Sequence, residues 1–367
     1  MTSRARLLAA MRREPVDRLP IQVRGVCAWD EAWVQSRHPS YRPVVEAVAA
    51  HGDYAVGWEP ALGTFLSATG AVSSETAVRP GGDWNEHTTT LHTPAGDLTA
   101  RYLASNRGLP GMQTEFFVKG PGDIAKVLSV PYEPLRPDVG GFLELAERIG
   151  ERGVVICGAM NPIAHVHDLM GSELLAILSV TERKVLRDLV WTFAERLLDL
   201  IRYLLGQGVG PVFGSAGQEY CGPPLMSPRD FREFCAEPER AIGEAIHADG
   251  RLLHVHCHGP LGAILDGLVA LGTDVLHPIE PPPMGDMPLA EAKRRVGDRV
   301  CFEGNIQIGD VYAGPTADIV RQVRQAVADT GGRGFILCPS ASPHTEVLPD
   351  QAVRNYLALI EAGVAAL

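Results

Sequence analysis

Short apolar runs alternate with longer amphipathic stretches from about residue 151 to the end of the chain. Six of the runs are typical of buried strands, at 154–157, 210–214, 251–257, 275–278, 300–304 and 334–337. The stretches between them are typical of helices, among them 182–207, 261–271, 289–296, 316–330 and 350–365. This alternation predicts parallel βαβ units, and their number favours a closed (β/α)8 TIM barrel over an open sheet.

The first part of the chain is less regular. We expect a short helix at the N-terminus, a strand at 19–26 and a hairpin at 93–100, within a region rich in glycine and proline. The chain is therefore predicted to be a single barrel domain, 1–367. A helical and hairpin extension and insertion would occupy about 1–150, and the regular units about 151–367.

Composition excludes several classes of function. The chain has 367 residues with a formal net charge of −11, so the basic footprint of a nucleic-acid or membrane-surface protein is absent. We find no apolar run of membrane-spanning length, and the N-terminal apolar run is too short for a signal-peptide core. Seven scattered cysteines are too few and too irregular for a disulfide framework, which favours a cytoplasmic location.

The segment 251–260 reads R-L-L-H-V-H-C-H-G-P and is typical of a strand that ends in a loop. Side chains two apart on a strand share a face, so His254, His256 and His258 should point the same way and Cys257 the opposite way. Imidazole is a common zinc ligand, although a strand-end histidine also often only hydrogen-bonds to the backbone. The density of histidines favours a metal-binding or catalytic role.

A barrel carries its chemistry at the carboxyl ends of its strands. The predicted strand ends gather polar side chains, namely Cys157, Asn161, Gln218, Glu219, His256, Cys257, His258, His277, Glu280, Glu303, Asn305, Cys338, Ser340, Ser342 and His344. We therefore expect the active site at this end of the barrel.

Several longer motifs resemble those of the uroporphyrinogen decarboxylase superfamily, a family of (β/α)8 barrels. They are R-R-E-P-V-D-R-L-P near the start, L-M-S-P-R-D-F-R-E-F at 225–234, H-x-x-G-x(12)-G-T-D-V-L-H-P from His256, G-D-R-V-C-F-E-G-N-I at 297–306 and S-P-H-T-E-V-L-P near the end. The resemblance covers nearly the whole chain.

One branch of this superfamily consists of decarboxylases that use no cofactor and hold their substrate carboxylates with arginines. The equivalent segment here, I-Q-V-R-G-V-C-A-W-D, contains only Arg24. One arginine is a poor clamp for many carboxylates, so a cofactor-free decarboxylase of a carboxylated substrate is the alternative prediction.

The other branch is similar to methylcobalamin:coenzyme M methyltransferases and related corrinoid-dependent enzymes. The resemblance implies a zinc site, here at His256, His258 and Cys338, with histidine in place of the family's first cysteine. It implies a thiol or methoxylated small molecule as substrate. It also implies a corrinoid such as methylcobalamin, as co-substrate or on a partner protein, and a homodimer. We predict a zinc-dependent methyltransferase; a corrinoid- or ligand-binding barrel that has lost catalysis is a third reading.

The remaining candidates come from the strand ends and loops. We expect Glu219, Glu303 and His344 to be catalytic, although Glu219 also suits a solvated loop. We expect Arg24, Asn305, Tyr220 and His277 to bind substrate. Asn305 could instead cap the following helix, and His277 could be a structural histidine.

Overall fold

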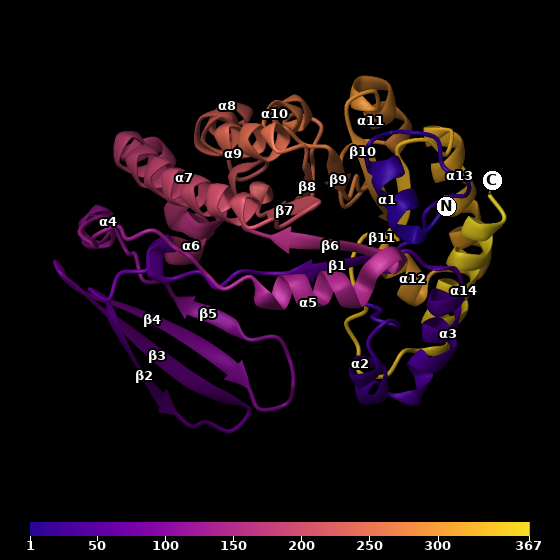
Figure 1. Cartoon of the computed structure of the whole chain (residues 1–367). Helices are drawn as coiled ribbons and strands as arrows, with labels where there is room; N and C mark the ends of the chain where they lie inside the picture. Colours follow the sequence, from indigo (N-terminus) through magenta and orange to yellow (C-terminus); the bar gives the residue numbers. More distant parts are fainter. Residues whose placement is uncertain (367) are drawn as a thin grey trace.

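The computed structural model describes residues 1–366, and its main feature is a curved parallel sheet (Figure 1). Its strands lie side by side in the order β1, β6, β7, β8, β9, β10, β11. Their bounds are Tyr54–Trp58, Gly153–Gly158, Val212–Ala216, Leu252–His256, Val275–His277, Cys301–Ile306 and Phe335–Pro339. The predicted α/β class with a parallel sheet is confirmed, and the seven strands are compatible with a TIM barrel.

The segment predicted as a strand at 19–26 forms only one bridge, between Ile21 and Leu337 of β11. Its backbone nevertheless bonds to both edges of the sheet. The Gln22 N–H donates to the carbonyl of Leu337 over 2.9 Å, and the Asp53 N–H, just before β1, donates to the carbonyl of Ile21 over 2.7 Å. The strand stops early because Gly25 turns the chain with a φ of 77°. This short segment thus occupies the eighth position, between β11 and β1.

Helices cover the outside of the sheet and separate consecutive strands, as βαβ units require. They are α1 Ser3–Met11, α2 Glu31–Ser36, α3 Arg42–His51, α4 Pro121–Leu128, α5 Gly140–Ile149, α6 Pro162–Thr181, α7 Arg183–Gly206, α8 Pro228–Phe231, α9 Glu237–Ala248, α10 Leu265–Ala270, α11 Leu289–Val296, α12 Ile308–Ala313, α13 Thr316–Thr330 and α14 Asp350–Val364. The helices predicted at 289–296 and 316–330 have the bounds of α11 and α13, whereas the one expected at 261–271 is shortened to α10.

Helix α1 closes one end of the sheet. Its Leu7, Ala10 and Met11 are buried against the first residues of the strands, including Val212 and Leu252. Apolar burial of this kind leaves no room for a site at the amino ends of the strands. Chemistry is therefore confined to the opposite, carboxyl ends.

A second, antiparallel sheet stands beside the main one, in the order β2 Ser73–Arg79, β3 Trp84–Thr93, β4 Gly96–Ser105 and β5 Met112–Glu115 (Figure 1). The hairpin predicted at 93–100 is the turn between β3 and β4. The sequence places the regular units only after about 150, but β1 already pairs with β6 in the main sheet. The early part of the chain therefore contributes to the barrel as well as to this added sheet.

Helix α6 has the length and apolar composition that could cross a membrane, contrary to the prediction of no such run. Half of its apolar window is buried inside the protein, and the helix packs along α7. Gly171 also interrupts it with a φ of 73°. These features are those of a core helix of the fold.

Candidate functional site

Histidines from β8 and acceptors from the neighbouring strands meet at the carboxyl end of the sheet. The parallel register sets His254 beside Val275 and His256 beside His277. On the far side of β9, Asn305 of β10 stands beside Cys338 of β11. Because side chains alternate along a strand, His254 and His256 share the inner face as predicted.

His254 is fixed by Glu303. Its Nε2 donates to Oε2 of the carboxylate over 2.9 Å, and both side chains are buried. The other oxygen, Oε1, has no hydrogen-bond partner and lies 3.7 Å from Nη2 of Arg24. Burial alone would raise the pKa of Glu303, but the charges and hydrogen bond of His254, with His277 and Arg24, hold it well below its usual range. Glu303 is therefore a buried anion with one oxygen left over.

His256 is fixed by His277. The two Nδ1 atoms lie 2.8 Å apart, and Nε2 of His277 lies 3.2 Å from the carbonyl oxygen of Pro339. Burial and the charges of nearby Arg24 and His258 lower the pKa of His256 to about 3. Burial lowers the pKa of His277 well below its ordinary value. Both rings are therefore neutral, and each carries one N–H.

His258 lies beyond the end of β8 and belongs to a different contact. Its Nδ1 donates to Oε2 of Glu280 over 3.1 Å, and the same oxygen accepts the Gly259 N–H over 3.0 Å. Gln307 donates to the other oxygen over 3.2 Å. Burial raises the pKa of Glu280, but these donors outweigh it and bring the pKa to about 2. The Glu280 carboxylate thus holds the loop after β8 through its hydrogen bonds with His258 and Gly259.

Cys338 completes a group that could hold a metal ion. One ligand atom each of His277, Glu303 and Cys338 lies within 4.8 Å of the others, and all three residues are buried. No further group of three or more such residues occurs within residues 1–366. The predicted ligands were His256, His258 and Cys338. The structure groups Cys338 with His277 and Glu303 instead, because the strand register carries it toward β10 and because Glu280 engages His258.

The donor set is chemically suitable for zinc. Imidazole nitrogen, carboxylate oxygen and thiolate sulfur are the three kinds of protein ligand that zinc accepts. Oε1 of Glu303 is a buried acceptor without a hydrogen-bond partner, so it is free to bind a cation. Burial keeps the pKa of Cys338 well above its ordinary value, so its thiol needs a bound cation to ionise.

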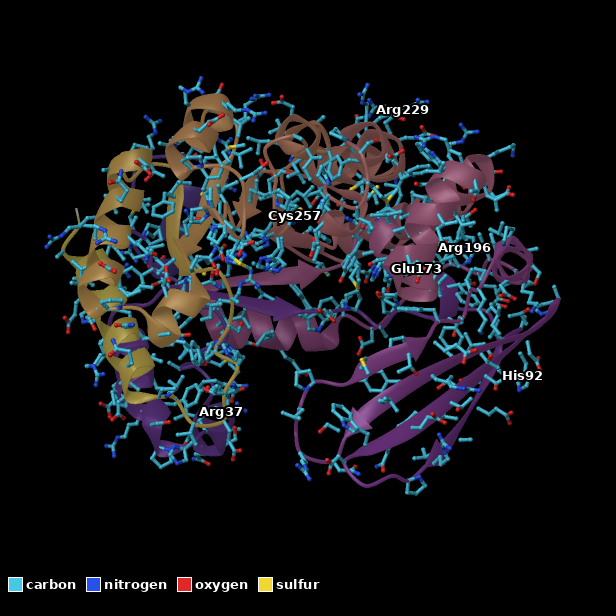
Figure 2. All side chains as sticks on the ribbon, turned by 180° about the vertical axis from the view of Figure 1, so that it is seen from behind. Arg37, His92, Glu173, Arg196, Arg229 and Cys257 are labelled. Atoms are coloured by element: carbon cyan, nitrogen blue, oxygen red, sulfur yellow. The ribbon has the colours of Figure 1, made fainter. Side chains whose placement is uncertain are left out.

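Cys257 directly follows the last residue of β8 and is absent from the cavity lining, which includes His254 and His256. Its thiol is fully buried. Burial, together with the negative charges of Glu219, Glu239 and Glu280, raises the pKa of this thiol well above its ordinary value. Figure 2 labels Cys257 near the middle of the molecule. Cys257 therefore lies outside the group formed by Cys338.

Two predicted residues lie on the loop after β7, in the short 3₁₀ helix Gln218–Cys221. The Glu219 side chain has a buried oxygen without a partner, and burial raises the pKa of its carboxyl group. Tyr220 stacks on His167, with ring centroids 3.7 Å apart and planes 4° apart. The loop thus presents a carboxyl group with a raised pKa and one buried oxygen that has no hydrogen-bond partner.

Of the last two predicted site residues, Asn305 has a buried polar atom, whereas His344 is exposed. Asn305 has a buried carbonyl oxygen with no partner, so it does not cap a helix. His344 is exposed, and its ring stacks on Tyr312 of α12 at 4.2 Å. His344, expected to be catalytic, is not among the residues that line the cavity described below. Its neighbour Ser342, by contrast, does line the cavity.

A cavity of about 580 Å³ adjoins this group of side chains. Its polar lining includes Arg24, His254 and His256, together with the carboxylates of Asp53 and Glu59. Its other walls are mainly apolar and include Val23, Val26, Trp29, Val56, Leu62, Leu145, Ile156 and Met160. Pockets of 300–1,000 Å³ typically hold a small molecule. The cavity therefore suits a compact, largely apolar ligand.

Sequence reasoning missed two glutamines of the site. Gln22 lines the cavity, and its Oε1 lies 3.6 Å from Sγ of Cys338. Gln307 holds Glu280. Both follow ordinary apolar residues, and no local pattern marks them. Only the pairing of 20–22 with β11 brings Gln22 to the site.

The model of the family described as Uroporphyrinogen decarboxylase (URO-D) matches residues 121–364. The chain belongs to the uroporphyrinogen decarboxylase family. This confirms the family expected from the motifs. Two curated uroporphyrinogen decarboxylases are similar to it, from Aeromonas salmonicida (30% identical over 132 residues) and Colwellia psychrerythraea (29% over 133 residues). Each match covers 35% of this chain and 36% of the relative.

A solved structure of a methyltransferase from Methanosarcina mazei has the same fold. The two chains superpose with a TM-score of 0.63 at 18% identity, over 99% of this chain and 98% of the other. The alignment thus spans nearly the whole length of both chains.

Proposed function

We propose that this protein is a zinc-dependent methyltransferase that moves a methyl group between a corrinoid and a thiol or methoxylated small molecule. The observation that carries the proposal is the group of His277, Glu303 and Cys338 beside the cavity. The methyltransferase with the same fold supports the reaction class, and the mixed nitrogen, oxygen and sulfur donors support the metal.

The protein's own groups have distinct tasks in this proposal. His277, Glu303 and Cys338 would hold the metal, which supplies a positive charge that lowers the pKa of a coordinated thiol or water. His256, neutral and open to the cavity, accepts the proton from the incoming nucleophile. Glu219, on the loop after β7, would serve as a proton donor, because burial raises the pKa of its carboxyl group.

The cavity also indicates how the reactants arrive. Its volume of about 580 Å³ fits a small molecule, whereas a corrin ring with its side chains is larger than drug-sized ligands. We propose that the small substrate enters the cavity and that a corrinoid, carried by a partner protein, approaches the mouth from outside. A cytoplasmic location and a homodimer remain predictions from the sequence.

The first test is elemental analysis of the purified protein, prepared without a histidine tag and dialysed against a weak chelator. We expect about one zinc per chain, followed by zinc-dependent demethylation of methylcobalamin when thiols are supplied. A folded protein that binds no divalent metal would contradict the proposal.

A second candidate is a cofactor-free decarboxylase. Two observations favour it: the curated relatives carry that name, and the cavity contains an arginine able to bind a carboxylate. Carbon dioxide release from carboxylated substrates by metal-stripped protein would establish this candidate in place of the first.

A further inference from the structure

Arg24 and Glu303 form an incomplete pair. Their closest atoms, Nη2 and Oε1, are 3.7 Å apart, well beyond the 2.7–2.9 Å of a charge-assisted hydrogen bond. Neither Nε of Arg24 nor Oε1 of Glu303 has a hydrogen-bond partner, although both atoms are buried. The Glu303 side chain is 1% exposed, whereas that of Arg24 is 29% exposed and reaches the cavity. Arg24 therefore offsets the negative charge of Glu303 without forming a hydrogen bond to it.

The same carboxylate belongs to the proposed metal group with His277 and Cys338. A divalent cation there and the guanidinium of Arg24 would be like charges within a few ångströms in a buried setting. At such a separation the repulsion is several times that in water. A metal ion and Arg24 therefore compete for the same carboxylate.

If a metal ion displaces the Arg24 side chain from Glu303, the residues that line the cavity determine what the guanidinium meets next. Arg24 is the one arginine among the cavity-lining residues, and no lysine joins it there. The two lining carboxylates are Asp53, which Arg6 and Arg18 already bind, and Glu59. Apolar walls, including Trp29 and Leu62, enclose the rest. A freed guanidinium would thus face a space suited to an apolar body with one anionic end.

We infer that Arg24 is a metal-linked switch: metal binding at Glu303 releases its guanidinium to bind the carboxylate of a small, apolar organic acid in the cavity. This inference rests on the proposed function and names the substrate class for it. Because linkage is reciprocal, an organic acid bound to Arg24 must also tighten metal binding. The metal and the acid are therefore expected to bind cooperatively.

The test measures zinc affinity of the metal-stripped full-length protein by competition with a chromophoric chelator, with and without benzoate. Benzamide, which has the same ring and no charge, is the matched ligand control. For the wild type we expect saturating benzoate to tighten zinc binding by about tenfold, within the usual range of coupling, and benzamide to leave it unchanged.

Three variants separate the steps. Arg24→Met removes the competing charge, so zinc should bind at least about tenfold more tightly than to the wild type, and benzoate should lose its effect. Arg24→Lys keeps the charge without the planar fork, so zinc affinity should stay near the wild-type value while the benzoate effect weakens. Arg148→Met, a matched control, removes a cation that contacts Asp30 and Trp29 and should behave as wild type.

The outcomes are distinguishable. Unchanged zinc affinity in Arg24→Met, a benzoate effect that survives in that variant, or equal effects of benzoate and benzamide would each overturn the switch while leaving the metal site in place. A wild-type protein that binds no zinc would overturn the proposed function and the switch together.

Discussion

His256 and His277 meet through their Nδ1 atoms, 2.8 Å apart, and Nε2 of His277 lies 3.2 Å from the carbonyl oxygen of Pro339. A carbonyl only accepts, so His277 donates from Nε2 and its Nδ1 holds a lone pair. His256 must then donate from Nδ1. The remaining nitrogen of His256, Nε2, therefore presents a lone pair, as a general base or metal ligand requires.

Replacing His277 with phenylalanine tests this relay. The ring shape is kept, but the Nδ1 lone pair of His277 is removed. That lone pair accepts from His256 in the metal-free protein and would have to leave this contact to bind a metal. We expect zinc content to fall at least about tenfold, which is the size of effect typical for partners that orient a metal ligand. The matched control is His92→Phe, on the distant antiparallel sheet (Figure 2). Full zinc occupancy in His277→Phe, by elemental analysis of the folded protein, would argue against the relay.

Local patterns in the sequence predicted most of the helices and strands after about residue 150. They did not predict which residues of distant elements contact one another. The alternation along β8 correctly placed His254 and His256 together at the cavity, whereas His258, expected on the same face, follows the end of the strand and is absent from the cavity lining. The amphipathic period gave the bounds of α11 and α13. The contacts of Arg24 with Glu303 and of Gln22 with Cys338 join opposite ends of the chain. They depend on the register of neighbouring strands, which no local pattern encodes.

The turn at Gly25 offers a test of the cavity wall. Gly25 has a φ of 77°, and a Cβ there would lie 2.5 Å from Cβ of Ser342, which lines the cavity. Gly25→Ala should therefore destabilise the fold by about 1–3 kcal/mol and displace the segment that carries Ser342. In Gly309→Ala, the added methyl group meets nothing within 4 Å, so that variant should be neutral or slightly more stable. Thermal unfolding of both variants checks the contrast, and equal Tm values would contradict it.

Glu239 predicts a dependence of stability on pH. It is buried between α9 and β7, where Ser215 and Gln218 donate to its carboxyl group. Burial, although opposed by these donors, raises its pKa to about 7. The folded state therefore binds a proton that the unfolded chain releases near pH 4.5. The contribution of this group is full below about pH 4.5 and is lost as the pH rises through about 7.

The Glu239→Gln variant isolates that contribution, since glutamine has a similar shape and does not titrate. We expect the difference in free energy of unfolding, wild type minus variant, to fall by roughly 2–3 kcal/mol between pH 5 and pH 8. Denaturant titrations at both values provide the measurement. A difference that does not change with pH would show that Glu239 keeps its ordinary pKa.

Cys338 and Cys257 provide the sharpest test of the ligand set, because both are fully buried thiols near the carboxyl end of the sheet, Cys338 in β11 and Cys257 just after β8. Only Cys338 lies within 4.8 Å of ligand atoms of His277 and Glu303. Cys338→Ser should reduce zinc affinity by about tenfold to a hundredfold, because a hydroxyl is a far weaker zinc ligand than a thiolate. Cys257→Ser places a similar polar atom in the core without touching the ligand group, so zinc affinity should stay at the wild-type value. Competition with a chromophoric chelator measures both. If Cys257→Ser lost zinc and Cys338→Ser retained it, the metal would be bound beside Cys257, and the proposed site would have to move there.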